Sequence, residues 1–454
     1  MMNRRILTAL MVTLSATAAA QSLQPAPRLV VSIAIDQLRT DYIEHFSPLY
    51  SEGGFKKLLR EGRVYETVAY PFSPVDQASA IVSIATGTTP YYHNIPAARW
   101  LDRSNLRTIF CVDDADYFAS PKHIATSTIS DELKVSTGGS ALVYGVAERI
   151  DAAILSAGHA ADGAFWKDEK SGMWLTSDYY SANAMQWLKS YRNATQQPAS
   201  AKGSGNDDVC SLALACIDGN AMGRDQVTDY LAVTFSAKGE YKTKWQTEME
   251  TVYVSLDKTL GRLVSAVEEK VGSDKVLFVL TSTGYADEPP TDYAKYRIPT
   301  GTFYINRTAN LLNMYLSAIY GRGMYVETCF HNQIFLNRKL IENQHISYTD
   351  VVSRAKEFLV QNSGVREVRE SPYTPAISGD LLVEIAPGWQ LVNEDRNESY
   401  TWRSQFVPFP IIFYGAGTKA EHVNTPVAVD RIAPTIAKAI QIRAPNACKE
   451  APLF

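Results

Sequence analysis

The sequence is short of the residues that build structural zinc sites and disulfide frameworks. Among 454 residues there are 5 cysteines and 7 histidines, and no two cysteines have the CxxC spacing of a zinc site. Basic residues are not in excess either, because Lys and Arg number 44 against 48 for Asp and Glu, a formal charge of −4. A chain with no basic excess is not expected to bind nucleic acid.

Long apolar runs are missing after the first twenty residues. None of the later runs approaches the roughly 18–20 residues needed to cross a bilayer, so we expect no membrane-spanning segment. The N-terminus is the exception, because Arg4 and Arg5 precede an apolar run that ends at three alanines, residues 18–20. This pattern predicts a secretory signal peptide over residues 1–20, and therefore an exported protein.

Export would place the cysteines in a compartment where disulfides form. Cys210 and Cys216 lie six residues apart in a polar, Gly/Ser-rich stretch at about residues 190–224. We expect this stretch to be a surface insertion and predict that its two cysteines pair. The alternative is that all five cysteines are free thiols.

Short apolar runs alternate with helical patterns along the rest of the chain. Residues 29–35, 230–235 and 276–280 predict buried strands, and the apolar spacing over residues 247–271 predicts a helix. This alternation is typical of an α/β fold with a mostly parallel central sheet and helices on both faces. Such sheets bind ligands beyond the carboxyl ends of their strands, and Asp36 directly follows the first strand.

Six segments that fall in order between residues 30 and about 440 carry a family pattern. They read IDQLRTDY, GGFKKLLREG, QASAIVSIATGTTPYYHNI, ILSAGHAADGAFWKDEKSGMWLTSDYY, DYLAVTFS and FPIIFYG. Together they resemble the alkaline phosphatase superfamily, in its type I phosphodiesterase/nucleotide pyrophosphatase family. The nearest likeness is to exported, phosphate-irrepressible alkaline phosphatases of Gram-negative bacteria.

The resemblance implies one alkaline-phosphatase-like domain over residues 28–445. Two insertions are expected within it, a cap at about residues 97–225 and a small β-α-β unit at about residues 325–400. The resemblance also implies a periplasmic location in a Gram-negative bacterium, and it leaves an association with the outer membrane open.

Members of this family use two zinc ions about 4 Å apart, bound by aspartate and histidine, while a threonine or serine attacks phosphorus. By this resemblance Asp36 matches the first zinc ligand and Ser73 matches the nucleophile. The five other ligand positions carry residues with no side chain suited to zinc. These positions are Gly239, Thr243, Thr283, Gly284 and Pro408.

The groups that would hold the phosphate are altered as well. The family's asparagine corresponds to Ala98, and its lysine and arginine correspond to Arg149 and Asp151. A carboxylate at the last of these positions is expected to repel a phosphate dianion.

These replacements predict a catalytically inactive homologue, a pseudoenzyme without zinc or another cofactor. Its expected role is binding or assembly in the cell envelope, with an envelope protein as partner and an oligomeric state that the sequence leaves open. Asp36 and Ser73 would then be remnants of the ancestral site.

The alternative is an atypical metal-dependent phosphomonoesterase or phosphodiesterase that uses Asp36 and Ser73. It would need two zinc ions, or a single calcium or magnesium ion bound by carboxylates. The nearest candidate carboxylates in the sequence are Asp76, Glu240, Asp287 and Glu288.

Overall fold

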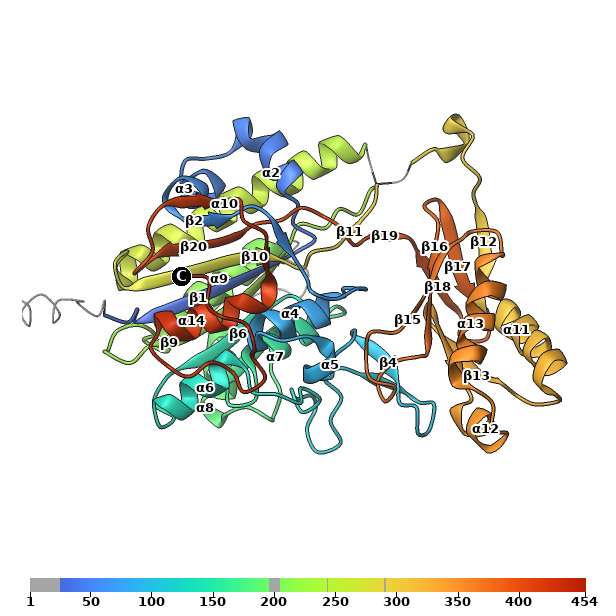
Figure 1. The fold of residues 1–454 in the computed structure, drawn as a ribbon. Helices are drawn as coiled ribbons and strands as arrows, with labels where there is room; N and C mark the ends of the chain where they lie inside the picture. The colour runs from blue at the N-terminus through green and yellow to red at the C-terminus, as the bar shows by residue number, and fades with distance from the viewer. Residues whose placement is uncertain (1–24, 196–204, 243, 290) are drawn as a thin grey trace, which may run out of the picture.

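The computed structural model describes residues 25–195, 205–242, 244–289 and 291–454. The predicted signal peptide therefore lies outside the described residues. A large α/β lobe holds most of the chain, and a smaller lobe formed by residues from about 300 to about 400 stands beside it (Figure 1).

Within the described residues, the large lobe is built around a nine-stranded sheet. Its parallel centre runs in the order β10 (Val276–Ser282), β1 (Leu29–Asp36), β9 (Asp229–Ser236), β6 (Val143–Ala147) and β7 (Gly163–Lys167). Beyond β10 lie β20 (Ile411–Gly415), β2 (Arg63–Tyr65) and β21 (Glu421–Val423), and beyond β7 lies β8 (Trp174–Leu175). Strands β20 and β8 run antiparallel to their central neighbours. The predicted mostly parallel α/β sheet is confirmed.

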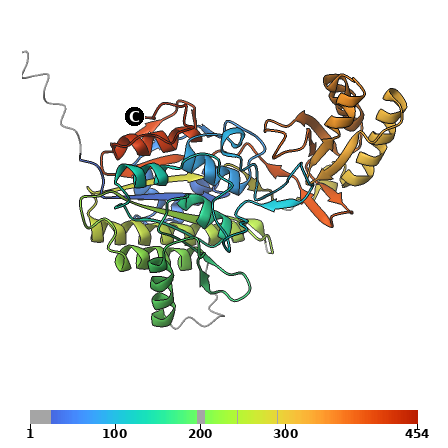
Figure 2. The ribbon, with the colours of Figure 1, turned by 90° about the horizontal axis from the view of Figure 1, so that it is seen from below.

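Two layers of helices cover the two faces of the central sheet (Figure 2), and successive side chains of the central strands belong to the buried clusters on opposite faces. On β1, Val31 and Ile33 belong to one buried cluster, whereas Val30 belongs to the opposite one. The first layer contains α2 (Thr40–Phe46), α3 (Phe55–Glu61), α9 (Gly205–Gly219) and α10 (Trp245–Val271). The second contains α4 (Gln77–Thr86), α6 (Ile129–Ser136), α7 (Ile150–Ala157) and α14 (Ile432–Ala439). Burial of each aliphatic side chain stabilises the folded state by about 1.5–3 kcal/mol. The continuous apolar sequence of the central strands therefore stabilises the packing of helices on both faces of the sheet.

The polar stretch at residues 190–224 is not a surface insertion throughout. Its second half forms α9, which packs against β9 and α10. Cys210 and Cys216 are both buried on this helix as free thiols. Since an α-helix rises about 1.5 Å per residue, the two lie about 9 Å apart along the axis, beyond the Cα separation of a disulfide. The predicted pairing is therefore wrong.

The range 97–225, expected to form a cap insertion, contributes β6, β7 and β8 to the central sheet. The range is therefore not wholly an insertion outside the sheet. It also contains the hairpin of β4 (Arg99–Leu101) and β5 (Thr108–Phe110), which reaches toward the smaller lobe (Figure 1).

The smaller lobe contains a four-stranded antiparallel sheet in the order β13 (Val326–Phe330), β14 (Gln333–Leu336), β16 (Leu381–Ile385) and β15 (Val365–Glu370). Its helices are α11 (Ile305–Tyr320), α12 (Arg338–Asn343) and α13 (Tyr348–Val360). Beside them lies a sheet of β12 (Gly301–Tyr304), β17 (Trp389–Asn393) and β18 (Glu398–Thr401). This lobe contains the β-α-β unit expected at about residues 325–400, and it begins earlier, at β12.

One buried carboxylate joins the two lobes. Asp380 in the smaller lobe accepts hydrogen bonds from Arg338 Nε at 2.7 Å and from the Tyr348 hydroxyl at 2.8 Å. Its two oxygens also accept hydrogen bonds from Arg103, which lies between β4 and β5 of the large lobe. The Tyr373 hydroxyl adds a second link, donating to the carbonyl of Pro74 at 2.7 Å.

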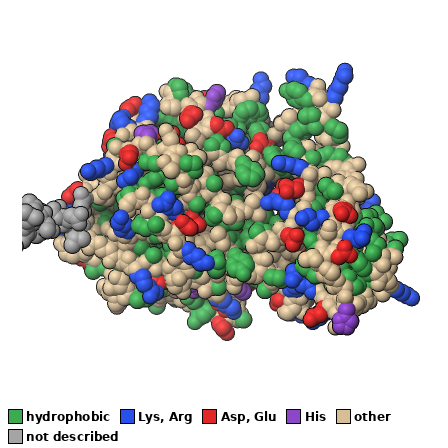
Figure 3. All heavy atoms as spheres, in the orientation of Figure 1, with side chains coloured by type: hydrophobic (Ala, Val, Ile, Leu, Met, Phe, Trp, Pro, Cys, Tyr) green, Lys and Arg blue, Asp and Glu red, His purple; other side chains and the backbone are tan. Residues whose placement is uncertain are grey.

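No helix in the described part of the chain combines the length and the hydrophobicity needed to cross a membrane. On the face shown in Figure 3, acidic and basic side chains are interspersed over both lobes. This mixture agrees with the nearly balanced composition of 44 basic and 48 acidic residues.

Candidate functional site

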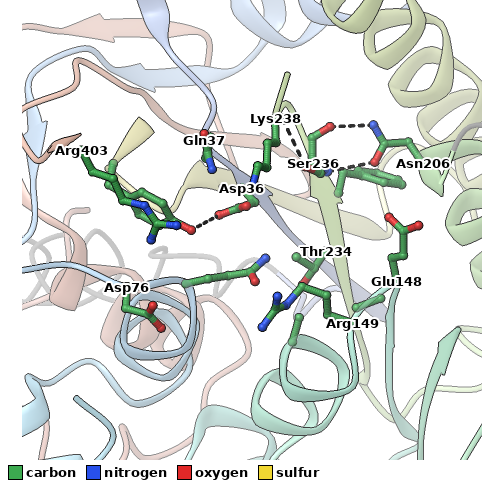
Figure 4. A pocket seen from close by; sticks show the side chains of 15 residues that line it. Asp36, Gln37, Asp76, Glu148, Arg149, Asn206, Thr234, Ser236, Lys238 and Arg403 are labelled. Atoms are coloured by element: carbon green, nitrogen blue, oxygen red, sulfur yellow. Dashed lines mark hydrogen bonds between the residues drawn. The ribbon is translucent and has the colours of Figure 1, made fainter. Parts of the chain in front are cut away.

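A pocket of about 250 Å³ opens at the carboxyl ends of β1, β9 and β6 (Figure 4). This is the edge at which parallel sheets bind ligands. The charged residues that line it are Asp36, Asp76, Glu148, Arg149, Lys238 and Arg403. The predicted position of the site, beyond Asp36 at the end of the first strand, thus coincides with a pocket.

Asp36 is the last residue of β1 and is 6% exposed. Its Oδ1 accepts hydrogen bonds from Thr283 Oγ1 and from the Tyr285 hydroxyl, both at 2.9 Å. Burial raises the pKa of Asp36 to about 6, although these two hydrogen bonds and the charge of Arg149 act in the opposite direction. A carboxyl group that exchanges a proton near neutral pH therefore lines the pocket.

Thr283 supports Asp36 instead of a metal ion. Besides donating to Asp36, its Oγ1 accepts a hydrogen bond from the backbone N–H of Gln37 at 2.9 Å. The Gln37 side chain in turn donates to Asp287 Oδ2 at 3.1 Å and accepts from the Asp287 N–H at 2.9 Å. These contacts fix the end of β1 against the segment that follows β10.

Gly284 has no room for a metal-binding side chain. Its φ is +74°, and a Cβ atom there would lie 2.5 Å from the ring of Tyr70. The ring is held in place because the Tyr70 hydroxyl donates to the carbonyl of Ser282 at 2.8 Å. Tyr70 thus fills the space that a histidine at position 284 would need.

We expect Gly284→His to destabilise the fold without creating a zinc site. The left-handed backbone and the contact with Tyr70 together should cost about 2–5 kcal/mol. Urea unfolding and the zinc content of the purified variant would measure both effects. Gly138→His is the matched control, because Gly138 also has a positive φ, 59°, but a Cβ atom there would have no other atom within 4 Å. Equal stability of the two variants would contradict the account of Tyr70.

Two of the other altered ligand positions, Gly239 and Pro408, belong to the described residues, and neither lines the pocket. A Cβ atom on Gly239 would lie 2.7 Å from Met249 Sδ, so this glycine packs against α10. The carbonyl of Pro408 accepts a hydrogen bond from the Thr40 N–H at 2.8 Å. Thr243 lies outside the described residues.

Asp151 does not present a free negative charge to the pocket. It is buried, and Arg149 donates to it through Nε at 3.0 Å and through Nη2 at 2.6 Å. The repulsion of phosphate expected from Asp151 is therefore offset by its own ion pair. Arg149 itself lines the pocket, and its side chain is 51% exposed.

Asp76 caps α4 at the mouth of the pocket. Its Oδ1 accepts hydrogen bonds from the N–H groups of Ala78 at 3.0 Å and Ala98 at 2.9 Å. Burial raises the pKa of Asp76 above its ordinary value. Ala98, at the family's asparagine position, contributes its backbone to this cap.

Ser73 is not among the residues that line the pocket, whereas Gln77 is. Ser73 Oγ accepts a long hydrogen bond, 3.5 Å, from Arg369 Nη2 of the smaller lobe. The two residues that the resemblance paired as ligand and nucleophile are thus placed differently, with Asp36 in the pocket and Ser73 outside it.

Two cations of the pocket were missed by the sequence reasoning. Arg403, in β19 (Arg403–Ser404), lies with its Nε 2.8 Å from Asp287 Oδ1, and Lys238 Nζ lies 3.3 Å from Asp287 Oδ2. Neither residue belongs to one of the family-like segments. Lys238 follows the predicted strand at residues 230–235 by three positions, so its place at the end of a buried strand could have pointed to it. No local pattern singles out Arg403, which only the folded chain brings to this pocket.

The side chains at this edge do not fit a pair of zinc ions. Each zinc ion needs three or four nitrogen, sulfur or oxygen ligands from the protein. Within the described residues, no three His, Cys, Asp or Glu side chains are grouped in a way that could hold a metal ion. Asp36 is instead surrounded by Thr283 and Tyr285 as hydrogen-bond donors. We therefore assign no chemical step to zinc.

The family model of type I phosphodiesterases/nucleotide pyrophosphatases matches residues 30–408. The chain belongs to this family. It is 25% identical to alkaline phosphatase PafA of Elizabethkingia meningoseptica, over 94% of each chain. It is 24% identical to alkaline phosphatase PhoV of Synechococcus elongatus, over 92% of this chain and 91% of PhoV. The crystal structure of wild-type PafA superposes with a TM-score of 0.79 at 24% identity, over 94% of this chain and 98% of PafA, which confirms the fold.

These comparisons correct the prediction that the chain is not an enzyme. Two relatives that match along almost its whole length, PafA and PhoV, are named alkaline phosphatases, and the family is one of phosphoric ester hydrolases. The prediction treated the loss of zinc ligands as the loss of activity. It left out the other charged groups that the fold brings to the pocket.

Proposed function

We propose that this chain hydrolyses phosphoric esters in the pocket at Asp36. The observation that carries the proposal is the combination of an ionisable carboxyl group and three cationic side chains in one pocket at the strand ends. Fold alone does not assign an activity, but such a pocket in a phosphoric ester hydrolase family supports this one.

Asp36 is the group that moves the proton. With a pKa of about 6, its carboxyl is mostly ionised at pH 7 and above. Thr283 and Tyr285 hold Oδ1, and no hydrogen bond within the described residues occupies Oδ2. Oδ2 can therefore accept a proton from a water molecule whose oxygen attacks phosphorus, while the neighbouring cations bind the phosphoryl oxygens. As the new P–O bond forms, the P–O bond to the ester group breaks, and the alcohol or phenol leaves either as the anion or with the proton that Asp36 has taken up.

A second cavity provides room for the ester group. Its volume is about 210 Å³, and it shares Asp76 and Arg403 with the first pocket. It extends between the two lobes, and its aromatic lining includes Tyr373, Tyr400, Trp402 and Phe406. An aryl group could occupy this cavity while its phosphoryl group lies beside Asp36, so aryl esters are the substrates of choice for a first assay.

We expect kcat/KM for an aryl phosphate to rise with pH through about 6 and then level off. The value of kcat/KM should rise with pH because a general base acts in its ionised form, and Asp36 ionises in this range. The measurement is nitrophenol release from a nitrophenyl monoester and from the corresponding diester, from pH 5 to 9. Absence of turnover of both esters by the folded protein would contradict the proposal.

Two variants control this assay. Ser73→Ala should keep the wild-type rate because Ser73 does not line the pocket. Arg322→Gln should do so as well, because Arg322 is an exposed residue outside the pocket lining. A Ser73→Ala protein that folds but has no turnover would identify the serine as the nucleophile and overturn the role given to Asp36.

A further inference from the structure

We propose that Arg149 and Arg403 hold the phosphoryl group in the place that zinc ions take in this family, so that this chain binds phosphate without a metal ion. The inference rests on the proposed function, because it concerns the same pocket. It follows from the mismatch between the side chains present and a zinc pair, together with the way in which the two arginines are anchored.

Arg149 is anchored on one side and free on the other. It precedes α7, and the carboxylate of Asp151 occupies its Nε and Nη2. Within the described residues no hydrogen bond occupies Nη1, which leaves two N–H groups for a ligand. A guanidinium held in this manner loses little side-chain entropy when it binds an anion.

Arg403 is anchored by a single ion pair with a carboxylate of another segment, Asp287 in β11 (Ala286–Asp287). Its Nε lies 2.8 Å from Asp287 Oδ1, and its guanidinium lies 5.4 Å from the centre of the Tyr285 ring. Asp287 is itself fixed by Gln37. The terminal nitrogens of Arg403 make no hydrogen bond within the described residues, so they too are available for phosphoryl oxygens.

The guanidinium groups of Arg149 and Arg403 point into the same pocket. Both interact electrostatically with Asp36 and with Asp76, although one arginine precedes α7 and the other lies in β19. Figure 4 shows both guanidinium groups reaching from different sides into the pocket in which Asp36 lies. Lys238 adds a third positive charge at this pocket.

A buried hydroxyl in the pocket wall also lacks a partner. Thr234 on β9 lines the pocket and is 4% exposed, and within the described residues its Oγ1 has no hydrogen-bond partner. Buried hydroxyl groups are normally hydrogen-bonded. A phosphoryl oxygen held between Arg149 and Arg403 would be an acceptor for this group after a rotation of the threonine side chain.

Calorimetric titration of chelator-treated protein with inorganic phosphate tests the inference. We expect saturable binding that added zinc does not strengthen. Arg149→Gln and Arg403→Gln should each weaken the affinity by about tenfold or more, because each removes a charge-assisted hydrogen bond. Arg322→Gln, an equal loss of charge at an exposed site, should bind as the wild type does. Circular dichroism of each variant shows whether it is folded.

The outcomes separate this inference from the proposed function. Phosphate binding that disappears with the chelator and returns with zinc would overturn the role of the arginines, even if the protein turns over esters. Metal-independent binding that both arginine variants weaken would support that role, even if no ester is hydrolysed. Variants that fold and bind phosphate as tightly as the wild type would overturn it.

Discussion

Asp36→Asn is expected to slow turnover strongly and to make the protein more stable at pH 8. Loss of a general base typically lowers the rate by about 10²–10⁴-fold. Stability should rise because burial holds the pKa of Asp36 at about 6 instead of its ordinary 3.8, so ionisation of this carboxyl opposes folding. That difference corresponds to about 3 kcal/mol above pH 6. Asparagine would still accept the hydrogen bonds of Thr283 and Tyr285 through its amide oxygen.

The pH dependence of unfolding checks the sign of this effect. Because the folded-state pKa is raised, the wild-type carboxyl causes no penalty below about pH 3.8 and the full penalty above about pH 6. The stability gain of Asp36→Asn should therefore grow with pH over this window. Urea unfolding at pH 5 and pH 8, together with the ester assay, measures both properties. A variant that is less stable than the wild type at pH 8 would contradict the account of Asp36.

Asp380→Asn is expected to destabilise the protein by about 3 kcal/mol, since it leaves the mostly buried Arg103 without its counterion and removes the partner of the more exposed Arg338. Asp380 is 3% exposed and is contacted by Arg103, Arg338 and Tyr348. Because Arg103 belongs to the large lobe, the attachment of the smaller lobe should loosen as well. Urea unfolding gives the loss in stability, and limited proteolysis between the lobes reports the loosening.

The matched control for Asp380 is Glu394→Gln. Glu394 also pairs with an arginine of the smaller lobe, Arg307, but both side chains are largely exposed. Exposed ion pairs contribute little, so we expect no measurable change in unfolding for this variant. Equal effects of the two substitutions would show that burial of Asp380 is not what makes its ion pairs important.

The fold could be predicted because its signals are local and periodic. The apolar run before Asp36 must be buried on both faces, and β1 indeed contributes side chains to two separate clusters. The polar stretch around Cys210 was misread, because its composition suggested a loop while α9 packs its apolar face against the sheet. Composition averages the two faces of a helix and hides such a pattern.

Only part of the site could be predicted. Asp36 was found because it ends a buried strand, where parallel sheets place ligands. Arg403 could not be found, since it lies 367 positions further along the chain and reaches the pocket through β19. The role of Tyr70 at Gly284 was equally invisible, because a steric contact between distant segments leaves no local pattern.

A crystal structure of the chelator-treated protein soaked with tungstate, a heavy-atom analogue of phosphate, would test most directly where phosphoric esters bind. We expect anomalous density in the pocket beside Asp36, within hydrogen-bond distance of Arg149 and Arg403 and without a metal peak. Tungstate bound elsewhere in a crystal whose pocket is open to solvent, or bound beside Asp36 only when zinc is added, would contradict it.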